Sequence, residues 1–246
     1  MKNLLDACGA GLAFYAFGYA LAYGDDASST VTTTFSGTKN FFLAGDVDPA
    51  IFFFQYTFSA TCVTIIAGTL AERCRMASYF VYSLYLTGFV YPIVVHAIWS
   101  NKGFLSVTNT NAAVGMGMID FAGSSVVHMT GGCTALFATY ILGPRQGRFY
   151  DRHGNELSKP GLTKGQSVGL QLLGTFILFF GWFGFNPGSA LLLTVQNKGK
   201  IAALAAVNTT LSAAAGTISA LFTYGFMQYR HSGEFELDLV MAMNGW

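Results

Sequence analysis

Six long apolar runs constrain the fold of this chain more than any other feature of its sequence. The runs cover residues 4–23, 50–71, 77–98, 120–142, 166–190 and 201–228. A helix rises about 1.5 Å per residue, so each run is long enough to cross a hydrocarbon core about 30 Å thick. Alternating segments of the length that a membrane barrel needs are absent from the sequence. We therefore predict an all-α membrane protein, a multi-pass helical bundle that spans the lipid bilayer.

The composition supports this class and excludes others. Charged residues make up 10% of the chain, whereas a soluble domain contains about 25%. The net charge is +1 and no basic stripe is present, so nucleic acid is excluded as a partner. The four cysteines form no Cys-x-x-Cys pair or Cys/His cluster. We therefore expect no metal site and no cofactor, and we expect the cysteines to be small packing residues.

The basic residues indicate how the spans are oriented. Six crossings place both ends of the chain on one side of the membrane. Nine basic residues belong to the ends and loops of that side: Lys2, Arg73, Arg75, Arg145, Arg148, Arg152, Lys159, Lys164 and Arg230. The opposite side carries four: Lys39, Lys102, Lys198 and Lys200. The positive-inside rule predicts that both ends are cytoplasmic and that loops 24–49, 99–119 and 191–200 face outward.

Residues 237–246, "LDLVMAMNGW", become apolar again after the sixth run. We interpret them as the beginning of a further span. On this interpretation, the chain is a fragment of a longer membrane protein.

The second run carries a stripe of polar and aromatic side chains. Gln55, Phe58, Ser59 and Cys62 recur at the i, i+3, i+4, i+7 spacing of one helix face. The alternative interpretation is packing, because a lone Phe in a span usually belongs to the core or faces lipid. The glutamine needs partners inside the bundle, which favours a functional face.

Two ionisable groups open the fourth run, in the stretch "DFAGSSVVHM". If that stretch is helical, His128 lies about 12 Å deeper than Asp120. Trp99 and Ser189 lie at the outer ends of their spans, and Phe185 shares a helix face with Ser189. Trp99 as part of the aromatic belt, and Pro187 as an ordinary kink near a helix end, are the alternative interpretations.

If these faces converge, they stack aromatic rings and a hydroxyl above a histidine. Aromatic faces attract a cation by up to about 2 kcal/mol once it is desolvated, and a hydroxyl accepts a hydrogen bond from it. The carbonyl-filter motif TVGYG of a metal-cation channel is absent. The pattern therefore favours a small cation that donates hydrogen bonds and can shed a proton.

Several motifs in order resemble one known family. "NLLDACGAGLAFYAFGYALAYG", "LAERCRM", "YPIVVHAIW", "DFAGSSVVHMTGG" and "GWFGFNPGS" are together similar to the ammonium transporter (Amt/Mep/Rh) superfamily, in particular its plant and algal type. The resemblance covers essentially the whole chain. It implies a fold of about eleven spans in two inverted halves, of which residues 1–246 would form a single incomplete domain, spans two to seven and the beginning of the eighth.

The resemblance also implies roles for individual residues. The outer ammonium-recruitment site of the family falls on Phe58, Trp99 and Ser189, and its stacked phenyl gate on Phe58 and Phe185. The first of two pore histidines falls on His128. Asp120 matches an aspartate that organises the recruitment site, and Gln55 matches a pore-facing position. The second pore histidine and the regulatory tail are not in this sequence, so we expect the fragment itself to be inactive.

Three functions follow as hypotheses. The first is a transporter of ammonium or ammonia, a homotrimer in the plasma membrane, as the resemblance implies. The second is an ammonium sensor that binds the ion but conducts poorly. The third is an intramembrane enzyme with Asp120 and His128 as an acid/base pair, which we reject because a helical separation of eight residues places them too far apart for contact. We thus expect no enzymatic activity.

Overall fold

A computed structural model describes residues 2–25, 28–113, 115–151, 153–159, 161, 165–191 and 196–246. These residues form helices and loops, with isolated β-bridges in place of strands. Six helical stretches in the described part of the chain are long and apolar enough to cross a membrane. The predicted all-α multi-pass fold is therefore confirmed. Arg152 and Lys164, counted above as basic residues of the inner side, lie outside the described residues.

The six spans run over Lys2–Tyr23, Pro49–Leu70, Met76–Trp99, Ser124–Leu142, Val168–Ala190 and Lys198–Ser232. The first comprises α1 (Lys2–Ala13), the π-helical η1 (Phe14–Gly18) and α2 (Tyr19–Tyr23), and a short 3₁₀ turn, η2 (Phe41–Leu43), follows in the loop. The second comprises α3 (Pro49–Ile65) and α4 (Ala67–Leu70), and the third α5 (Met76–Tyr85), the π-helical η3 (Leu86–Val90) and α6 (Tyr91–Trp99). The fourth comprises the π-helical η4 (Ser124–Met129) and α7 (Thr130–Leu142). The fifth comprises α8 (Val168–Phe185) and the 3₁₀ turn η5 (Pro187–Ala190), and the sixth is α9 (Gln196–Ser232), followed by the short α10 (Leu239–Gly245).

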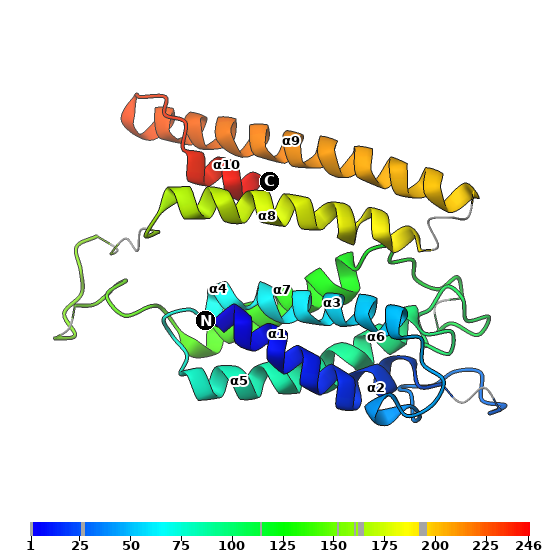
Figure 1. Ribbon diagram of the computed structural model, residues 1–246. Helices are drawn as coiled ribbons and strands as arrows, with labels where there is room; N and C mark the ends of the chain where they lie inside the picture. Colours follow the sequence, from blue (N-terminus) through cyan, green and yellow to red (C-terminus); the bar gives the residue numbers. More distant parts are fainter. Residues whose placement is uncertain are drawn as a thin grey trace. The chain divides into compact units, whose positions relative to one another are not determined.

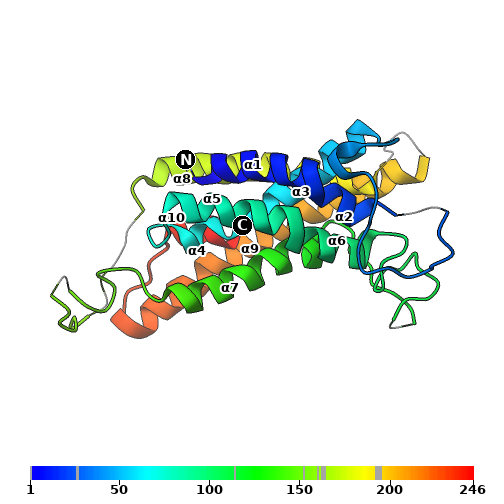
Figure 2. The same ribbon diagram turned by 90° about the horizontal axis from the view of Figure 1, so that it is seen from below.

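The chain divides into two compact units, Met1–Gly161 and Leu162–Trp246. Each unit is described by itself. The first unit contains four spans. The first span packs against the second and third, and the fourth packs against α3, α4 and α6. Figure 1 shows these helices running side by side, and Figure 2 shows them after a turn of 90°. The prediction of one incomplete domain over 1–246 stays a prediction.

Large side chains fill the interior of the first unit. Phe14, Phe58, Tyr79 and Tyr91 are fully buried, with 1% of their surface exposed at most. Their rings form edge and stacked contacts, such as Phe14 with Phe52 at 6.0 Å between ring centroids. This packing fixes the positions of the four spans relative to one another.

Three of the four spans in the first unit contain a π-helical segment. A π-helical turn bonds each N–H to the fifth preceding carbonyl, so it changes which side chains share a face. At the first two such segments the backbones approach closely, because a methyl group on Gly88 would lie 3.2 Å from the Ala13 Cβ atom. The sequence pattern does not predict these segments.

The fourth span begins at Ser124, four residues later than predicted. Gly123 adopts a left-handed conformation with φ of 88° immediately before it. Residues 120–123 are therefore a turn that enters the helix. The helical geometry assumed between Asp120 and His128 is wrong, and with it the separation of about 12 Å along a helix axis.

The second unit contains α8, η5, α9 and α10. The Asn186 side-chain amide donates to Thr209 Oγ1 at 3.0 Å and joins the end of α8 to α9. After α9 the chain turns at Gly233, and α10 packs against both longer helices. The Trp246 ring lies 4.7 Å from the ring of Phe179. The helix α10 lies within the segment predicted to begin a further span, which stays a prediction.

Basic side chains bind backbone carbonyls at one end of the first unit. Lys2 Nζ donates to the carbonyl oxygens of Leu70 and Cys74 at 3.0 and 3.2 Å. Arg73 donates to the Gly143 carbonyl at 2.6 Å. These residues belong to the set that predicts the cytoplasmic side, and they lie at the same end of the helices. The direction in which the spans cross the membrane stays a prediction.

Candidate functional site

Phe58 and Trp99 lie against each other in the first unit. Their ring centroids are 5.6 Å apart and their planes cross at 82°, an edge-to-face contact. Phe58 comes from α3 and Trp99 from the last turn of α6. The geometry is one that aromatic pairs favour because the edge of one ring is positive and the face of the other negative.

Trp99 is also fixed by a hydrogen bond. Its indole Nε1–H donates to the backbone carbonyl oxygen of Asp120 at 2.8 Å. A methyl group on Gly123 would lie 3.4 Å from the indole ring, so the turn that opens the fourth span packs against the tryptophan. The ring is thus held on one side by α3 and on the other by this turn.

The Asp120 carboxylate caps the helix that begins beside it. Its two oxygens accept hydrogen bonds from the backbone N–H groups of Gly123, Ser124, Ser125 and Val126, at 2.7 to 2.9 Å, and from the Ser125 hydroxyl. The first N–H groups of a helix have no partner within the helix, so one side chain here satisfies all of them. The carboxylate is committed to the backbone.

The pKa of Asp120 reflects the same contacts. Partial burial acts to raise it, but the hydrogen bonds from Ser125, Val126 and Gly123 outweigh burial and hold the pKa below its ordinary value. A carboxylate that accepts several N–H bonds is stabilised in its charged form. Asp120 is therefore ionised at neutral pH and acts on the site through the structure it organises.

His128 lies in the π-helical segment η4, and its side chain is exposed. Its neighbours Val126 and Val127 are fully buried and anchor η4 against the rest of the unit. Farther along the span, Gly131 allows α7 to approach α3, because a methyl group there would meet the Cys62 carbonyl oxygen at 2.9 Å. His128 thus projects from a firmly packed segment.

The polar stripe predicted on the second span faces the interior. Phe58, Ser59 and Cys62 have at most 1% of their surface exposed, which confirms that they share a buried face. Gln55 Oε1 and Ser59 Oγ are buried and accept no hydrogen bond from the described residues. A buried polar atom without a partner costs about 1–3 kcal/mol, so these two atoms mark a place where a water or a polar ligand would be stabilised.

Phe185 and Ser189 belong to the second unit. Phe185 is the last residue of α8, and Ser189 lies in the 3₁₀ turn η5, which Pro187 begins. Pro187 therefore lies at a helix end, as its alternative interpretation supposed. The Ser189 hydroxyl donates to the Phe185 carbonyl at 2.7 Å, which leaves the lone pairs of its oxygen to accept. That these residues join Phe58 and Trp99 stays a prediction.

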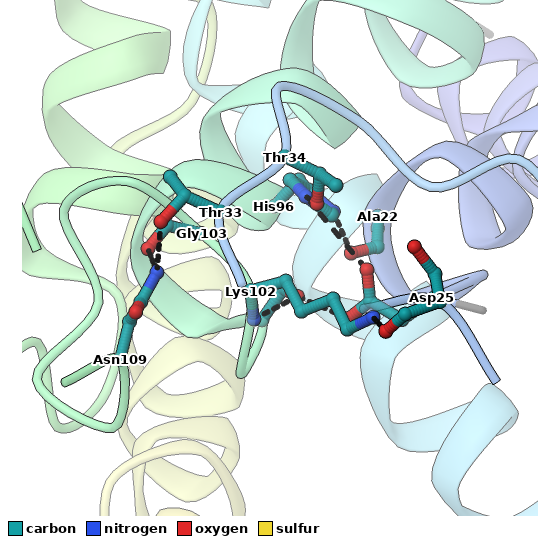
Figure 3. A network of polar contacts seen from close by, with 10 residues as sticks. Ala22, Asp25, Thr33, Thr34, His96, Lys102, Gly103 and Asn109 are labelled. Atoms are coloured by element: carbon teal, nitrogen blue, oxygen red, sulfur yellow. Dashed lines mark hydrogen bonds and ion pairs between the residues drawn. The ribbon is translucent and has the colours of Figure 1, made fainter. Parts of the chain in front are cut away.

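A network of polar contacts joins loop 24–49 to the end of α6 and was not predicted from the sequence (Figure 3). His96, which is fully buried, contacts Ala22 and Thr34, and Ser100 donates to Asp25. The signal for it was a histidine inside the third apolar run, one turn before Trp99. Ionisable residues in membrane spans are rare and usually functional.

The described residues contain no group of three or more His, Cys, Asp or Glu side chains that would hold a metal ion. The first unit instead offers the partly exposed ring of Trp99 beside the buried ring of Phe58, together with backbone dipoles and the Asp120 carboxylate. Such a surface attracts a cation through ring faces rather than through a negative charge. It suits a monovalent cation bound without metal-type coordination.

Comparison with known proteins agrees with this chemistry. The Ammonium Transporter Family matches residues 1–246, the whole chain. "Putative ammonium transporter 1" of Caenorhabditis elegans is 40% identical over 231 residues, which are 94% of this chain and 42% of that protein. "Ammonium transporter 1 member 1" of Oryza sativa subsp. japonica is 41% identical over 232 residues, 90% of this chain and 45% of that protein. The chain thus spans less than half the length of these relatives.

Solved structures share the fold. The "Sensor Amt Protein" has a TM-score of 0.73 and 32% identity, and covers 96% of this chain with 54% of its own. Mep2 of Saccharomyces cerevisiae has a TM-score of 0.75 and 25% identity, and covers 98% of this chain with 51% of its own. The arrangement of helices is therefore similar both to a protein whose title names it a sensor and to Mep2.

Proposed function

Because the chain belongs to the Ammonium Transporter Family, whose members are transporters rather than enzymes, we propose that a protein containing it conducts ammonium across a membrane, whereas residues 1–246 alone do not. The cation is recruited at an outer site made by Phe58, Trp99 and Ser189. It loses a proton near the gate formed by Phe58 and Phe185. The neutral molecule and the proton then pass inward beside His128.

The observation that carries this proposal is the fixed pair of Phe58 and Trp99. Its rings meet edge to face at 5.6 Å, and the indole N–H is already bonded to the Asp120 carbonyl. A fixed ring presents its face to a cation without first losing side-chain freedom. A desolvated cation gains up to about 2 kcal/mol from such a face.

The polar groups near the pair suit a hydrogen-bond donor. The Ser189 hydroxyl gives its proton to Phe185, so toward the pathway its oxygen is an acceptor. Gln55 Oε1 is buried and accepts nothing from the described residues, and an N–H of ammonium or ammonia supplies the missing donor. Asp120 organises the site, since its carboxylate is taken up by backbone N–H groups.

We test this by uptake of methylammonium in cells that lack their own ammonium transporters. The protein is expressed with any flanking sequence that is encoded with it. Trp99→Ala weakens recruitment, so the apparent KM rises about tenfold, in line with the loss of a cation–π contact of about 1–2 kcal/mol. Replacement of both Trp99 and His128 by Ala abolishes uptake.

Matched controls separate these effects from loss of folding. Trp182→Phe changes another tryptophan, and His231→Ala another histidine, at the far end of α9. Both keep wild-type uptake. Unchanged uptake in the Trp99→Ala, His128→Ala double variant would contradict the roles proposed for Trp99 and His128.

The second candidate is an ammonium sensor that binds the ion and conducts poorly. The structural similarity to the "Sensor Amt Protein" favours it, at 32% identity over 96% of this chain. Current measurements on membranes that contain the purified protein separate the two functions. Saturable binding of ammonium with no current supports the sensor, and a current that saturates with ammonium supports the transporter.

We further propose a homotrimer in the plasma membrane with both ends of this chain cytoplasmic. The basic residues that bind carbonyls at one end of the first unit, such as Lys2 and Arg73, support this orientation through the positive-inside rule. Labelling of single cysteines from outside the cell tests the orientation. Mass measurement of the detergent-solubilised protein tests the trimer.

A further inference from the structure

His96 is a fully buried histidine at the outer end of α6. Its ring is enclosed by the end of α2 and by the loop that follows (Figure 3). Nδ1 lies 2.9 Å from the carbonyl oxygen of Ala22, and Nε2 lies 2.8 Å from Thr34 Oγ1. Both ring nitrogens are thus engaged with the first span and its loop.

The carbonyl of Ala22 determines where the ring carries its proton. A carbonyl oxygen can only accept, so Nδ1 carries hydrogen in every protonation state. In the neutral ring Nε2 is then an acceptor, and the Thr34 hydroxyl donates to it. In the charged ring Nε2–H is a donor, and Thr34 changes from donor to acceptor.

Asp25 supplies a counter-charge for the second state. Its Oδ1 lies 3.9 Å from His96 Nε2. That oxygen is buried and accepts no hydrogen bond from the described residues, while the other oxygen accepts from the Ser100 hydroxyl at 2.5 Å. A proton on Nε2 therefore gives the unsatisfied oxygen an ion-pair partner.

The other titratable groups around α6 carry no second carboxylate into this arrangement among the described residues. The elements packed against α6 bring Tyr15 from η1, Tyr19 and Tyr23 from α2 and His128 from η4, whereas η3 has none. Lys102 follows α6, and its ammonium group donates to the Ser29 carbonyl at 3.2 Å. The Asp120 carboxylate accepts hydrogen bonds from backbone N–H groups at the start of η4.

We propose that His96 is a positioning residue for the recruitment site. With Asp25 and Thr34 it fastens the outer loop to the last turn of α6. This inference rests on the proposed function only for its effect on ammonium. The fastening itself is a property of the folded first unit.

The last turn of α6 connects the fastening to the site. Trp99 lies three residues after His96, and the Ser100 N–H donates to the His96 carbonyl at 3.3 Å. His96 and Ser100 are both bound to residues of the loop, one on each side of Trp99. Whatever fixes these two residues also fixes the backbone that carries the indole ring.

The structure assigns different roles to the two loop residues. Thr34 is the hydrogen-bond partner of His96 Nε2, so Thr34→Ala removes the contact between the loop and the ring. Asp25 accepts a hydrogen bond from the Ser100 hydroxyl, so Asp25→Ala removes the contact on the other side of Trp99.

The first test uses the fluorescence of Trp99 in lipid nanodiscs. The full protein carries Trp182→Phe and Trp246→Phe, together with Phe at any tryptophan in flanking sequence, so that only Trp99 emits. We expect its emission to shift to longer wavelength with His96→Gln and with Asp25→Ala, because a looser backbone exposes the indole ring to water. The control His231→Gln leaves the emission unchanged.

Two results overturn the proposal. One is an emission that neither His96→Gln nor Asp25→Ala changes. The other is a shift of the same size with His231→Gln. Asp25→Ala lies in the loop, so it decides the question even if His96→Gln fails to fold.

The second test measures methylammonium uptake with Thr34→Ala and Asp25→Ala. Each raises the apparent KM about fivefold, the size of a typical coupling between two sites, with Vmax unchanged, and the control His231→Gln leaves it unchanged. A KM that ignores both substitutions overturns the effect on recruitment. If uptake is absent altogether while the fluorescence shift behaves as expected, the proposed function fails and the fastening stands.

Discussion

The two units of the molecule contain similar apolar spans but pack them very differently. In the first unit each span contributes fully buried side chains, among them Phe14, Tyr79 and Tyr91. In the second unit α8 buries none of its residues, and Ala190, Ala213 and Ala242 are the buried hydrophobic residues among those that the structure describes there. The first unit interlocks large side chains, whereas the second pairs helices mainly through small ones.

The bilayer explains how both can exist. Lipid tails are as apolar as leucine, so an exposed apolar side chain in a span costs little, and helices associate through close packing and hydrogen bonds. Phe180 with 82% of its surface exposed is therefore acceptable in a membrane. The difference predicts which substitutions lower the free energy of unfolding. Four pairs of substitutions test that prediction.

The first pair replaces a phenylalanine in each unit. Phe14 is fully buried and contacts Tyr19, Phe52 and Tyr91, so Phe14→Ala leaves a cavity and lowers the free energy of unfolding by about 3 kcal/mol. Phe180→Ala removes an equally large but exposed ring and costs less than about 0.5 kcal/mol. Unfolding in mixed micelles measures both. Equal losses would contradict the contrast between the units.

The second pair compares two tyrosine hydroxyls within the first unit. The Tyr79 hydroxyl donates to Asp6 Oδ2, and both residues are fully buried. Asp6 Oδ1 accepts no hydrogen bond from the described residues. Tyr79→Phe therefore leaves a buried carboxyl group without a partner and lowers the free energy of unfolding by about 2 kcal/mol. Tyr140 has 84% of its surface exposed, and Tyr140→Phe leaves the unfolding free energy unchanged. An unchanged free energy of unfolding in Tyr79→Phe would mean that water reaches Asp6.

The sequence predicts the spans well because their cause is local. A run of about twenty apolar residues has few alternatives to a helix in lipid, since every backbone group must be bonded within the segment. The π-helical segments and the turn at Gly123 were not predicted. They depend on which backbone carbonyl lies nearest after packing, such as the contact between Gly88 and Ala13, and single-sequence periodicity does not contain that information.

The residues of the candidate site also differ in whether the sequence predicts them. Phe58, Trp99 and Asp120 come together inside the first unit through contacts that the helix ends enforce. The predicted role of Asp120 as an organiser has a physical basis in its hydrogen bonds, although the role itself stays a prediction. His96 was overlooked because its partners, Asp25 and Thr34, lie in a loop more than sixty positions away.

The third pair compares two aspartates that cap helices, one in each unit. Asp120 accepts hydrogen bonds from four N–H groups, and Asp238 accepts from those of Val240 and Met241. Asp120→Asn lowers the free energy of unfolding by about 1 kcal/mol, because its amide group replaces one of the two oxygens that accept hydrogen bonds, whereas Asp238→Asn keeps the single capping oxygen and changes it little.

The direction of the pKa shift of Asp120 determines how its contribution to the free energy of unfolding depends on pH. The folded-state pKa of Asp120 is lowered, so its contribution is complete above the unfolded value of about 3.9 and is lost as the pH falls through the lower folded value. Wild type therefore loses this contribution only below about pH 4, and Asp120→Asn lacks that part of the decline. Parallel pH curves for the two proteins would show that the carboxylate is not the stabilising group.

The last pair concerns glycines on helix faces. A methyl group on Gly9, in α1, would lie 2.6 Å from Ser83 Oγ, whereas one on Gly181, in α8, meets nothing within 4 Å. Gly181→Ala therefore raises the free energy of unfolding by up to about 1 kcal/mol through helix propensity, and Gly9→Ala lowers it. The sign at Gly181 also tests the strip that Gly181 forms with Gly184, since small residues at this spacing let another helix approach closely. If Gly181→Ala destabilises the complete protein, a helix packs on that strip in the bilayer, and the open face of α8 is an interface rather than a surface for lipid.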